Sequence, residues 1–175
     1  MQRISVVGST GSGKTRTAGR IGDALGIPVL ELDSIHWGPD WTPTDRETIR
    51  VQVGEFVPGD AWVVDGNYRS LTQDLVWDAA DAIVWLDLPF RTAAAQLLKR
   101  TLSRATRREP LWSGNRESLR KALLSRDSIL WWLVKTHRKN RSRYLHDMRS
   151  GAYRHLQWIR LCSRREVDTW LESLG

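Results

Sequence analysis

The chain has 175 residues, enough for one domain with a full hydrophobic core. Its hydrophobic fraction of 41% and charged fraction of 27% are typical of a globular protein, and a single cysteine, Cys162, excludes an internal disulfide and a cysteine-based zinc site. The formal net charge is +7, and most of the basic residues are arginines, whose planar fork of donors suits ligands that carry phosphate.

The first part of the chain alternates between strand and helix patterns. Ile4–Val7 is a short β-branched run that ends at a glycine, which predicts a buried strand. Lys14–Leu25 places apolar residues on one helical face and is followed by a glycine, so we expect a helix there. Val29–Leu32 predicts a second strand. Ser34–Pro43 contains a glycine and two prolines and therefore predicts a loop.

A second helix is expected to start at Thr44, because Thr44 and Glu47 have the spacing of a capping box. This helix should run to about Val57, where a Pro-Gly pair stops it. The next elements predicted from apolar periodicity are a strand at Ala61–Val64, a helix at Thr72–Ala79, a strand at Ala82–Leu86 and a helix from Arg91 to about Arg104.

The last third of the chain predicts one loop, a long helical region and a final strand. Thr106–Arg116 holds a proline and a Ser-Gly pair, which indicates a mobile loop. Residues 116–149 have a helical pattern with a potential break near Asp127, followed by a strand at His155–Leu161 and a closing helix at Arg164–Leu174. Strands separated by helices imply an α/β protein with a five-stranded parallel sheet covered on both faces. We expect a single domain over residues 1–175.

A glycine-rich segment between the first strand and the first helix fits the pattern G-x-x-x-x-G-K-[ST] completely. In such a loop, backbone N–H groups surround the β-phosphate, and the following helix directs the positive end of its dipole at the same charge. The lysine is expected to reach the β- and γ-phosphates and the threonine hydroxyl to ligate Mg²⁺. The segment consists of Gly8, Ser9, Thr10, Gly11, Ser12, Gly13, Lys14 and Thr15. The sequence therefore predicts a site for ATP and Mg²⁺.

Three expected strands are followed by a single carboxylate, at Asp33, Asp65 and Asp87. The carboxyl ends of parallel strands lie along the ligand crevice, beside the phosphate loop. The chain lacks the N-K-x-D segment with which GTPases read their base, and it contains no Asp-Glu pair of the kind that ends a strand in motor-type ATPases. The lack of a hydrolytic glutamate favours phosphate transfer to a bound acceptor over hydrolysis.

Further short motifs follow the phosphate loop in a specific order. They are Leu30-Glu31-Leu32-Asp33, His36-Trp37-Gly38-Pro39 with Trp41, Trp62-Val63-Val64-Asp65-Gly66-Asn67-Tyr68, Ala80-Asp81 and Leu86-Asp87-Leu88-Pro89. Their order and spacing over most of residues 1–105 resemble the small nucleotide kinases of the adenylate kinase superfamily, and most closely the adenylate-kinase-like group labelled DNA topology modulation proteins.

This resemblance implies a three-layer P-loop NTPase fold of the adenylate-kinase type. It also implies an acceptor-binding segment at residues 34–60 and a lid-like segment at residues 104–118. The implied activity is transfer of the γ-phosphate of MgATP to a small-molecule acceptor, expected to be a nucleotide or a nucleoside. A cytoplasmic protein without membrane association is expected, because the phosphate loop leaves no room for a signal peptide and no apolar run is long enough to cross a bilayer.

The resemblance also implies roles for residues on the acceptor side. Asp65 would orient magnesium-bound water, and so joins Thr15 as a predicted metal-site residue. Asp33 would face the acceptor and take or position its hydroxyl proton. Arg69 stands where the family holds the phosphate of its acceptor, although Asn67 and the following tyrosine replace the Phe-Pro of AMP-binding members. We therefore predict that the acceptor contacts Asp33, Asn67, Arg69 and two tryptophans that could stack on a base, Trp37 and Trp41.

Arginines are expected to surround the transferred phosphoryl group. Arg100 matches a lid-base arginine of the family, whereas a second arginine often found nearby is replaced by Gln96. Arg138 and Arg141, on the long helix after the lid-like segment, would supply the remaining charge. Together with Lys14, Asp33 and Asp65, these three arginines form the predicted catalytic set.

Two alternatives to a kinase stay open. The basic segment from Lys135 to Arg143 and the net charge of +7 fit a nucleotide-binding regulator that acts on nucleic acid, although no helix-turn-helix, zinc finger or RNA-binding signature is present. A slow ATPase that serves as a switch is the other alternative. The regulator and the kinase differ in where the arginines lie: convergence on the phosphate loop favours catalysis, and an outer basic face favours nucleic acid.

Overall fold

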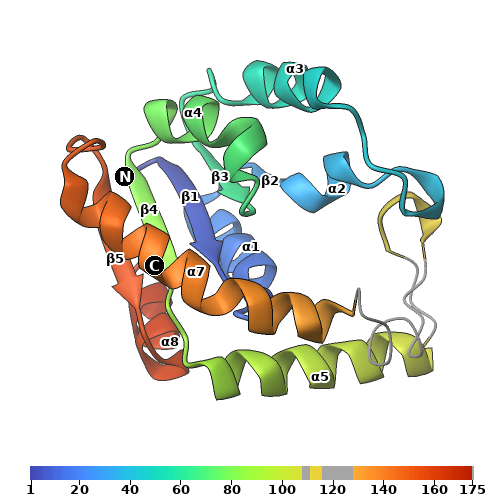
Figure 1. The fold of residues 1–175 in the computed structure, drawn as a ribbon. Helices are drawn as coiled ribbons and strands as arrows, with labels where there is room; N and C mark the ends of the chain where they lie inside the picture. The colour runs from blue at the N-terminus through green and yellow to red at the C-terminus, as the bar shows by residue number, and fades with distance from the viewer. Residues whose placement is uncertain (108–110, 116–127, 175) are drawn as a thin grey trace.

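The apolar β-branched runs predicted from the sequence form the centre of the molecule. The computed structural model describes residues 1–107, 111–115 and 128–174, and these contain a five-stranded, all-parallel sheet in the order β2-β3-β1-β4-β5 (Figure 1). The strands are β1 (Arg3–Gly8), β2 (Val29–Glu31), β3 (Trp62–Asp65), β4 (Ala82–Leu86) and β5 (Gln157–Leu161). The predicted parallel sheet with helices around it is confirmed.

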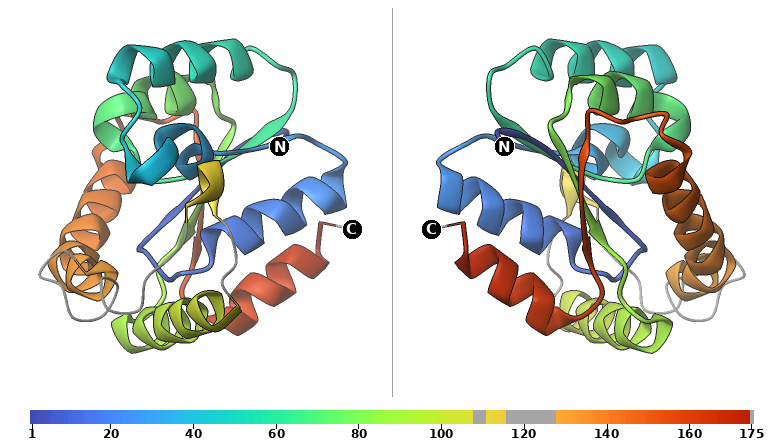
Figure 2. Two further views of the ribbon diagram at one scale, coloured as in Figure 1. Left: turned by 90° about the vertical axis from the view of Figure 1, so that its right-hand side faces the viewer. Right: turned by 90° about the vertical axis from the view of Figure 1, so that its left-hand side faces the viewer.

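Helices cover both faces of the sheet, which gives three layers. Helices α1 and α8 lie on one face, whereas α3, α4 and α7 lie on the other, and α5 runs beside α7 at the carboxyl ends of the strands (Figure 2). The helices are α1 (Lys14–Leu25), α2 (Leu32–His36), α3 (Arg46–Phe56), α4 (Arg69–Ala79), α5 (Phe90–Arg107), α7 (Ile129–Ser150) and α8 (Arg164–Glu172), with short 3-10 turns η1 (Pro39–Trp41) and η2 (Trp112–Gly114).

Each face of the sheet has its own apolar core. On the α1 and α8 side, Ile4 and Ile21 are fully buried with Leu171 nearby. On the other side, Trp62 and Trp85 are buried among residues of α3, α4 and α7. Residues alternate between these two cores along each strand, as expected for a sheet that is buried on both faces. The two cores hold the carboxyl ends of the strands, and the loops that follow them, in fixed positions.

The segment between β2 and β3 differs from its prediction. The strand predicted at Val29–Leu32 ends at Glu31, and the next residues form α2 instead of beginning a loop. The Ser34 hydroxyl donates to the Glu31 carbonyl oxygen at 2.6 Å and so satisfies a backbone acceptor at the end of the strand. The N-cap of α3 is Asp45 and not Thr44, because the Asp45 carboxylate accepts a hydrogen bond from the backbone N–H of Thr48 at 2.9 Å.

The second half of the chain also departs from its prediction in part. Helix α5 extends past Arg104 to Arg107, so the loop predicted from Thr106 begins later. Of the lid-like segment 104–118, the structure describes 104–107 and 111–115. The remaining residues of that segment, and the potential break near Asp127, lie outside the described residues. None of the helices in the described part of the chain is long and apolar enough to span a bilayer.

Candidate functional site

The phosphate loop joins the end of the central strand β1 to the start of α1. Gly13 is the N-cap of α1 with φ of 90°, and no side chain caps the helix there. Gly11 has φ of 76°, and a Cβ atom at this position would overlap the Ala93 carbonyl and come within 2.9 Å of Leu97 Cβ, both on α5. Glycine is therefore required both by the backbone conformation and by the close approach of α5. The first N–H groups of α1 are left to bind an anion.

Lys14 and Thr15 begin α1 and point toward the loop and the strand ends. The Lys14 ammonium donates to the carbonyl oxygen of Ser9 at 3.3 Å, so it folds back over the loop. The Thr15 hydroxyl lies 2.6 Å from Asp65 Oδ2 and 3.2 Å from Glu31 Oε1. Because a hydroxyl has one hydrogen, it donates to the nearer carboxylate, Asp65. The structure thus brings together the two residues predicted to form the metal site.

Asp65 is a buried carboxylate with a raised pKa. It ends β3 and is only 3% exposed. Burial raises its pKa to about 6, although Lys14 and the hydrogen bond from Thr15 act in the opposite direction. Its second oxygen, Oδ1, is buried and has no hydrogen-bond partner among the described residues. A buried, unpaired carboxylate oxygen beside a threonine hydroxyl is a donor set that suits the water shell of Mg²⁺.

The described residues fit MgATP in this way. Thr15 and Asp65 would hold the metal, directly or through water, and the loop with Lys14 would hold the phosphates. The described parts of the chain contain no group of three or more His, Cys, Asp or Glu residues that could hold a metal by themselves. Mg²⁺ usually binds through one or two protein oxygens together with substrate phosphates, so a site of this kind depends on the nucleotide.

Asp33 lies in α2, two residues after the end of β2. Tyr68 donates its hydroxyl to Asp33 Oδ1 at 2.5 Å. Burial, first of all, and the negative charge of Asp33 raise the pKa of Tyr68, so the tyrosine remains a donor at neutral pH. The negative charge of Asp33 also contributes to the raised pKa of Asp65, so the two carboxylates repel each other. Sequence reasoning predicted Asp33 but assigned no role to Tyr68.

The two tryptophans predicted to contact the acceptor belong to an aromatic cluster. Trp37 and Trp41 meet edge to face with 5.8 Å between their ring centres, and Trp41 meets Trp112 of η2 in the same way at 6.4 Å. Trp112 also donates its indole N–H to Glu31 at 3.1 Å. Asn115 accepts from the Trp41 backbone N–H at 3.1 Å and donates to a neighbouring backbone carbonyl. The described part of the lid-like segment thus packs on the predicted acceptor segment.

Arg69 and Asn67 each have an intramolecular partner. Arg69 donates two hydrogen bonds, at 2.6 and 2.9 Å, to the carboxylate of Asp147 on α7, and Asp147 is buried. The Asn67 side chain is hydrogen-bonded to the backbone of Gly8, the first residue of the phosphate loop. Neither partner was predicted, because Asp147 and Gly8 are far from these residues in sequence.

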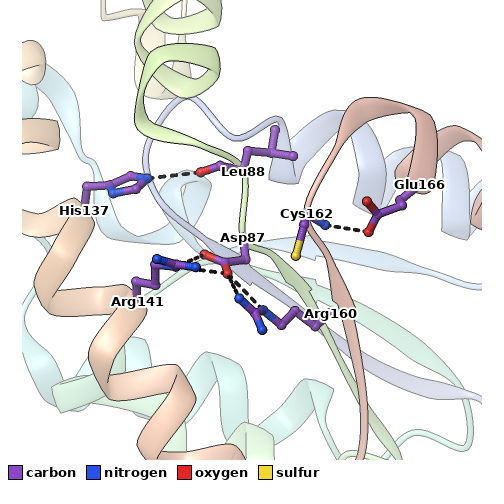
Figure 3. Close-up of polar contacts among 7 residues, drawn as sticks. All are labelled: Asp87, Leu88, His137, Arg141, Arg160, Cys162 and Glu166. Carbon is purple, nitrogen blue, oxygen red and sulfur yellow. Dashed lines mark hydrogen bonds and ion pairs between the residues drawn. The ribbon is translucent and has the colours of Figure 1, made fainter.

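Asp87, which follows β4, is held by two arginines (Figure 3). Arg141 of α7 donates its Nε–H to the two carboxylate oxygens at 3.0 and 3.1 Å, and Arg160 of β5 donates to Oδ2 at 2.9 and 2.5 Å. The Asp87 side chain is 3% exposed, whereas that of Arg141 is 52% exposed. Leu86 of β4 is paired with Gly8, the first residue of the phosphate loop. Asp87, the residue after Leu86, therefore lies next to the start of this loop together with its two arginines. Sequence reasoning missed Arg160 entirely.

The other predicted arginines lie on α5 and α7. Arg100 is half-buried on α5, one turn after Gln96, whose side chain lies near Gly13 of the phosphate loop. Arg138 is exposed on α7, one turn before Arg141. Arg141 thus faces the strand ends, whereas Arg138 faces solvent. The roles of these arginines in phosphoryl transfer stay predictions.

No protein-family model matches the chain, and no curated protein matches it. Solved structures do. A gluconokinase from Sinorhizobium meliloti 1021 superposes with a TM-score of 0.53 at 21% identity, over 99% of this chain and 93% of that one. Shikimate kinase from Bacteroides thetaiotaomicron gives a TM-score of 0.51 at 14% identity, over 99% and 96%. The fold is that of the P-loop kinases.

A third structure supports the same conclusion. Shikimate kinase from Acinetobacter baumannii, in complex with shikimate, gives a TM-score of 0.51 at 19% identity, over 99% of this chain and 90% of that one. At these identities the likeness establishes the adenylate-kinase-like P-loop kinase fold. These three structures carry no support for the narrower resemblance to DNA topology modulation proteins.

Proposed function

We propose that this protein is an ATP-dependent phosphotransferase that moves the γ-phosphate of MgATP to a hydroxyl group of a small molecule. The observation that carries the proposal is the pairing of Thr15 with Asp65 at the phosphate loop, next to a second carboxylate, Asp33, that is held by Tyr68. The first pair suits a nucleotide-bound magnesium ion, and the second carboxylate suits an acceptor. The overall fold is one that known small-molecule kinases use.

Each group has a chemical task in this proposal. MgATP, when bound, supplies the phosphoryl group to be transferred. Lys14 and the loop amides hold negative charge on the phosphates and keep the reacting group in place. Asp65 and Thr15 orient the water shell of the metal. Asp33, positioned by Tyr68, accepts the proton of the acceptor hydroxyl as the hydroxyl oxygen bonds to the γ-phosphorus. The bond between the γ-phosphorus and the bridging oxygen of the β-phosphate breaks in the same step, and ADP leaves.

The contacts of Arg69 bear on the acceptor. An acceptor that carries its own phosphate, such as a nucleoside monophosphate, needs a cation to hold that phosphate. Arg69, the residue predicted to do so, already donates two hydrogen bonds to the buried Asp147. We therefore favour a hydroxyl acceptor without a phosphate, such as a nucleoside or another small hydroxylated compound. The neighbours named for gluconate and shikimate kinase activity agree with this choice.

The experiment that tests the proposal measures ADP formation from MgATP alone and with a panel of nucleosides, nucleoside monophosphates, sugars and hydroxylated acids. Lys14→Ala serves as the inactive variant, and Lys99→Ala, an exposed lysine of α5, as its matched control. We expect one acceptor class to raise turnover well above the basal rate in the wild type and Lys99→Ala but not in Lys14→Ala. Binding of ATP without stimulation by any acceptor would contradict the kinase proposal.

One observation favours the nucleic-acid alternative as a second candidate. Lys135, Arg138, Lys139 and Arg143 are all exposed along α7, although Arg141 turns toward Asp87. An exposed basic face supplies the sequence-independent part of nucleic-acid affinity. The same ADP assay with DNA or RNA at physiological salt tests it. Stimulation by nucleic acid, with no stimulation by any small acceptor, would favour the regulator.

A further inference from the structure

The side chain of Asn67 is bonded to the first residue of the phosphate loop through both of its polar atoms. Its Oδ1 accepts a hydrogen bond from the Gly8 N–H at 3.1 Å, and its Nδ2 donates to the Gly8 carbonyl oxygen. One side-chain amide therefore satisfies the donor and the acceptor of one backbone residue, as a neighbouring strand would do.

The course of the neighbouring strand explains this arrangement. β1 pairs with β3 as far as Val6, opposite Asp65, and the Gly66 N–H still donates to the Val6 carbonyl oxygen at 3.3 Å. β3 then ends, whereas β1 continues to Gly8 and stays paired with β4 on its other side. Alternate residues of a strand direct their backbone groups to the same neighbour, so Gly8 faces the place that β3 has left. The Asn67 amide fills the next position of the hydrogen-bond ladder.

A third hydrogen bond ties this amide to α7. The Tyr144 hydroxyl donates to the same Oδ1 atom of Asn67 at 2.9 Å. Tyr144 is buried, and its ring packs against Trp85 at 5.5 Å and Trp77 at 6.3 Å. Exchange of O and N in the Asn67 amide would place its NH2 group against the Gly8 N–H and its oxygen against the Gly8 carbonyl oxygen. Only one orientation of the amide is therefore compatible with its surroundings.

We infer that Asn67 is a positioning residue for the nucleotide site, which holds the start of the phosphate loop in its binding conformation and links it to α7 through Tyr144. The loop binds phosphate with backbone N–H groups, and their affinity depends on being held in place before the ligand arrives. α7 also carries Arg141, which is paired with Asp87. The position of this helix and the conformation of the phosphate loop therefore depend on each other. The inference rests on the proposed function in one respect, that the loop binds a nucleotide.

The test compares Asn67→Ala and Asn67→Asp with Tyr144→Phe and a matched control, Tyr153→Phe. The Tyr153 ring also packs on Trp77, at 5.1 Å, but its hydroxyl makes no hydrogen bond to the described part of the chain. Hydrogen exchange of residues 8–13 is measured without ligand, and the dissociation constant of MgADP is measured by competition with a fluorescent analogue. Neither measurement requires an acceptor or turnover.

In Asn67→Ala we expect exchange in residues 8–13 to accelerate and the MgADP dissociation constant to rise about tenfold, the effect of one to two lost hydrogen bonds. Asn67→Asp loses the donor to Gly8 and should show at least the same effect. Tyr144→Phe should raise the constant about threefold, since one bond is lost, and Tyr153→Phe should leave it unchanged.

Unchanged exchange and affinity in Asn67→Ala would overturn the inference, even with a lower melting temperature, because the residue would then support the fold only. If the wild type binds no nucleotide, the proposed function fails. The exchange comparison still decides whether Asn67 holds the loop.

Discussion

Replacing Asp65 by asparagine should make the ligand-free protein more stable while removing its response to magnesium. The Asp65 side chain is almost fully buried, and burial is the largest cause of its raised pKa. An asparagine of the same shape keeps an oxygen to accept the hydrogen bond from Thr15, now 2.6 Å from Asp65 Oδ2, and removes the buried charge. We therefore predict that Asp65 lowers the free energy of unfolding of the ligand-free protein, and that its role is in the metal site.

The magnitude follows from the pKa. An aspartate with an ordinary pKa of 3.8 has here a pKa of about 6 in the folded state. Each pKa unit corresponds to 1.36 kcal/mol, so ionised Asp65 lowers the free energy of unfolding by about 3 kcal/mol at pH 7. The folded state binds the proton more tightly than the unfolded state, so this cost is absent below pH 4, grows as the pH rises to about 6, and is complete above it. The increase in melting temperature for Asp65→Asn is at most roughly 6–12 °C, because the new amide nitrogen takes the place of Oδ1, which has no hydrogen-bond partner among the described residues.

Urea unfolding of the wild type and Asp65→Asn at pH 4, 5, 6 and 7.5 measures this difference. The variant should be the more stable at pH 7.5, and the two curves should converge toward pH 4. MgADP should stabilise the wild type more than ADP alone does, whereas the variant should gain nothing from the metal. An Asp65→Asn protein that is less stable than the wild type at pH 7.5, or a difference that does not depend on pH, would refute the reasoning.

Three further outcomes are expected. Gly11→Ala should unfold readily or fail to fold, because the new Cβ overlaps a backbone carbonyl of α5. The matched variant Gly19→Ala in α1 has open space around the new Cβ. It should raise the free energy of unfolding by about 0.5–1 kcal/mol in urea titrations. Asp33→Asn should lower kcat at least about a hundredfold with ATP affinity unchanged, and equal kcat values would rule out a proton-accepting role. Arg160→Met should lower the free energy of unfolding by about 1.5–3 kcal/mol, since Asp87 stays buried with one cation fewer, and a neutral result in urea would show that Arg141 alone suffices.

The phosphate loop and the sheet could be predicted because their signals are local. The pattern from Gly8 to Thr15 fixes a strand before it and a helix after it, and the β-branched runs that follow repeat at the spacing of crossover units. The ends of helices were harder to predict where two adjacent residues have similar capping propensities. Thr44 and Asp45 are both good helix caps, and only the hydrogen bond from Thr48 decides for Asp45.

The partners within the site could not be predicted, because they come from distant segments. Asp87 meets Arg160 across 73 residues of sequence, and Arg69 meets Asp147 across 78. No spacing rule connects such pairs; they depend on how α7 and β5 pack on the rest of the sheet. The carboxylates at the strand ends were predictable as a group, since parallel strands bring their carboxyl ends together.

The cluster of Trp37, Trp41 and Trp112 contributes to the optical spectrum of the protein, beside the edge-to-face pair of Trp77 and Trp158. Three indoles that meet edge to face at 5.8 and 6.4 Å are close enough for their electronic transitions to couple, which adds a contribution to the ultraviolet circular dichroism that depends on their mutual orientation. Two of the rings belong to the segment after β2 and the third to η2. Any ligand or solvent change that separates those two segments therefore alters the spectrum without an added label, and a Trp112→Phe protein supplies the baseline.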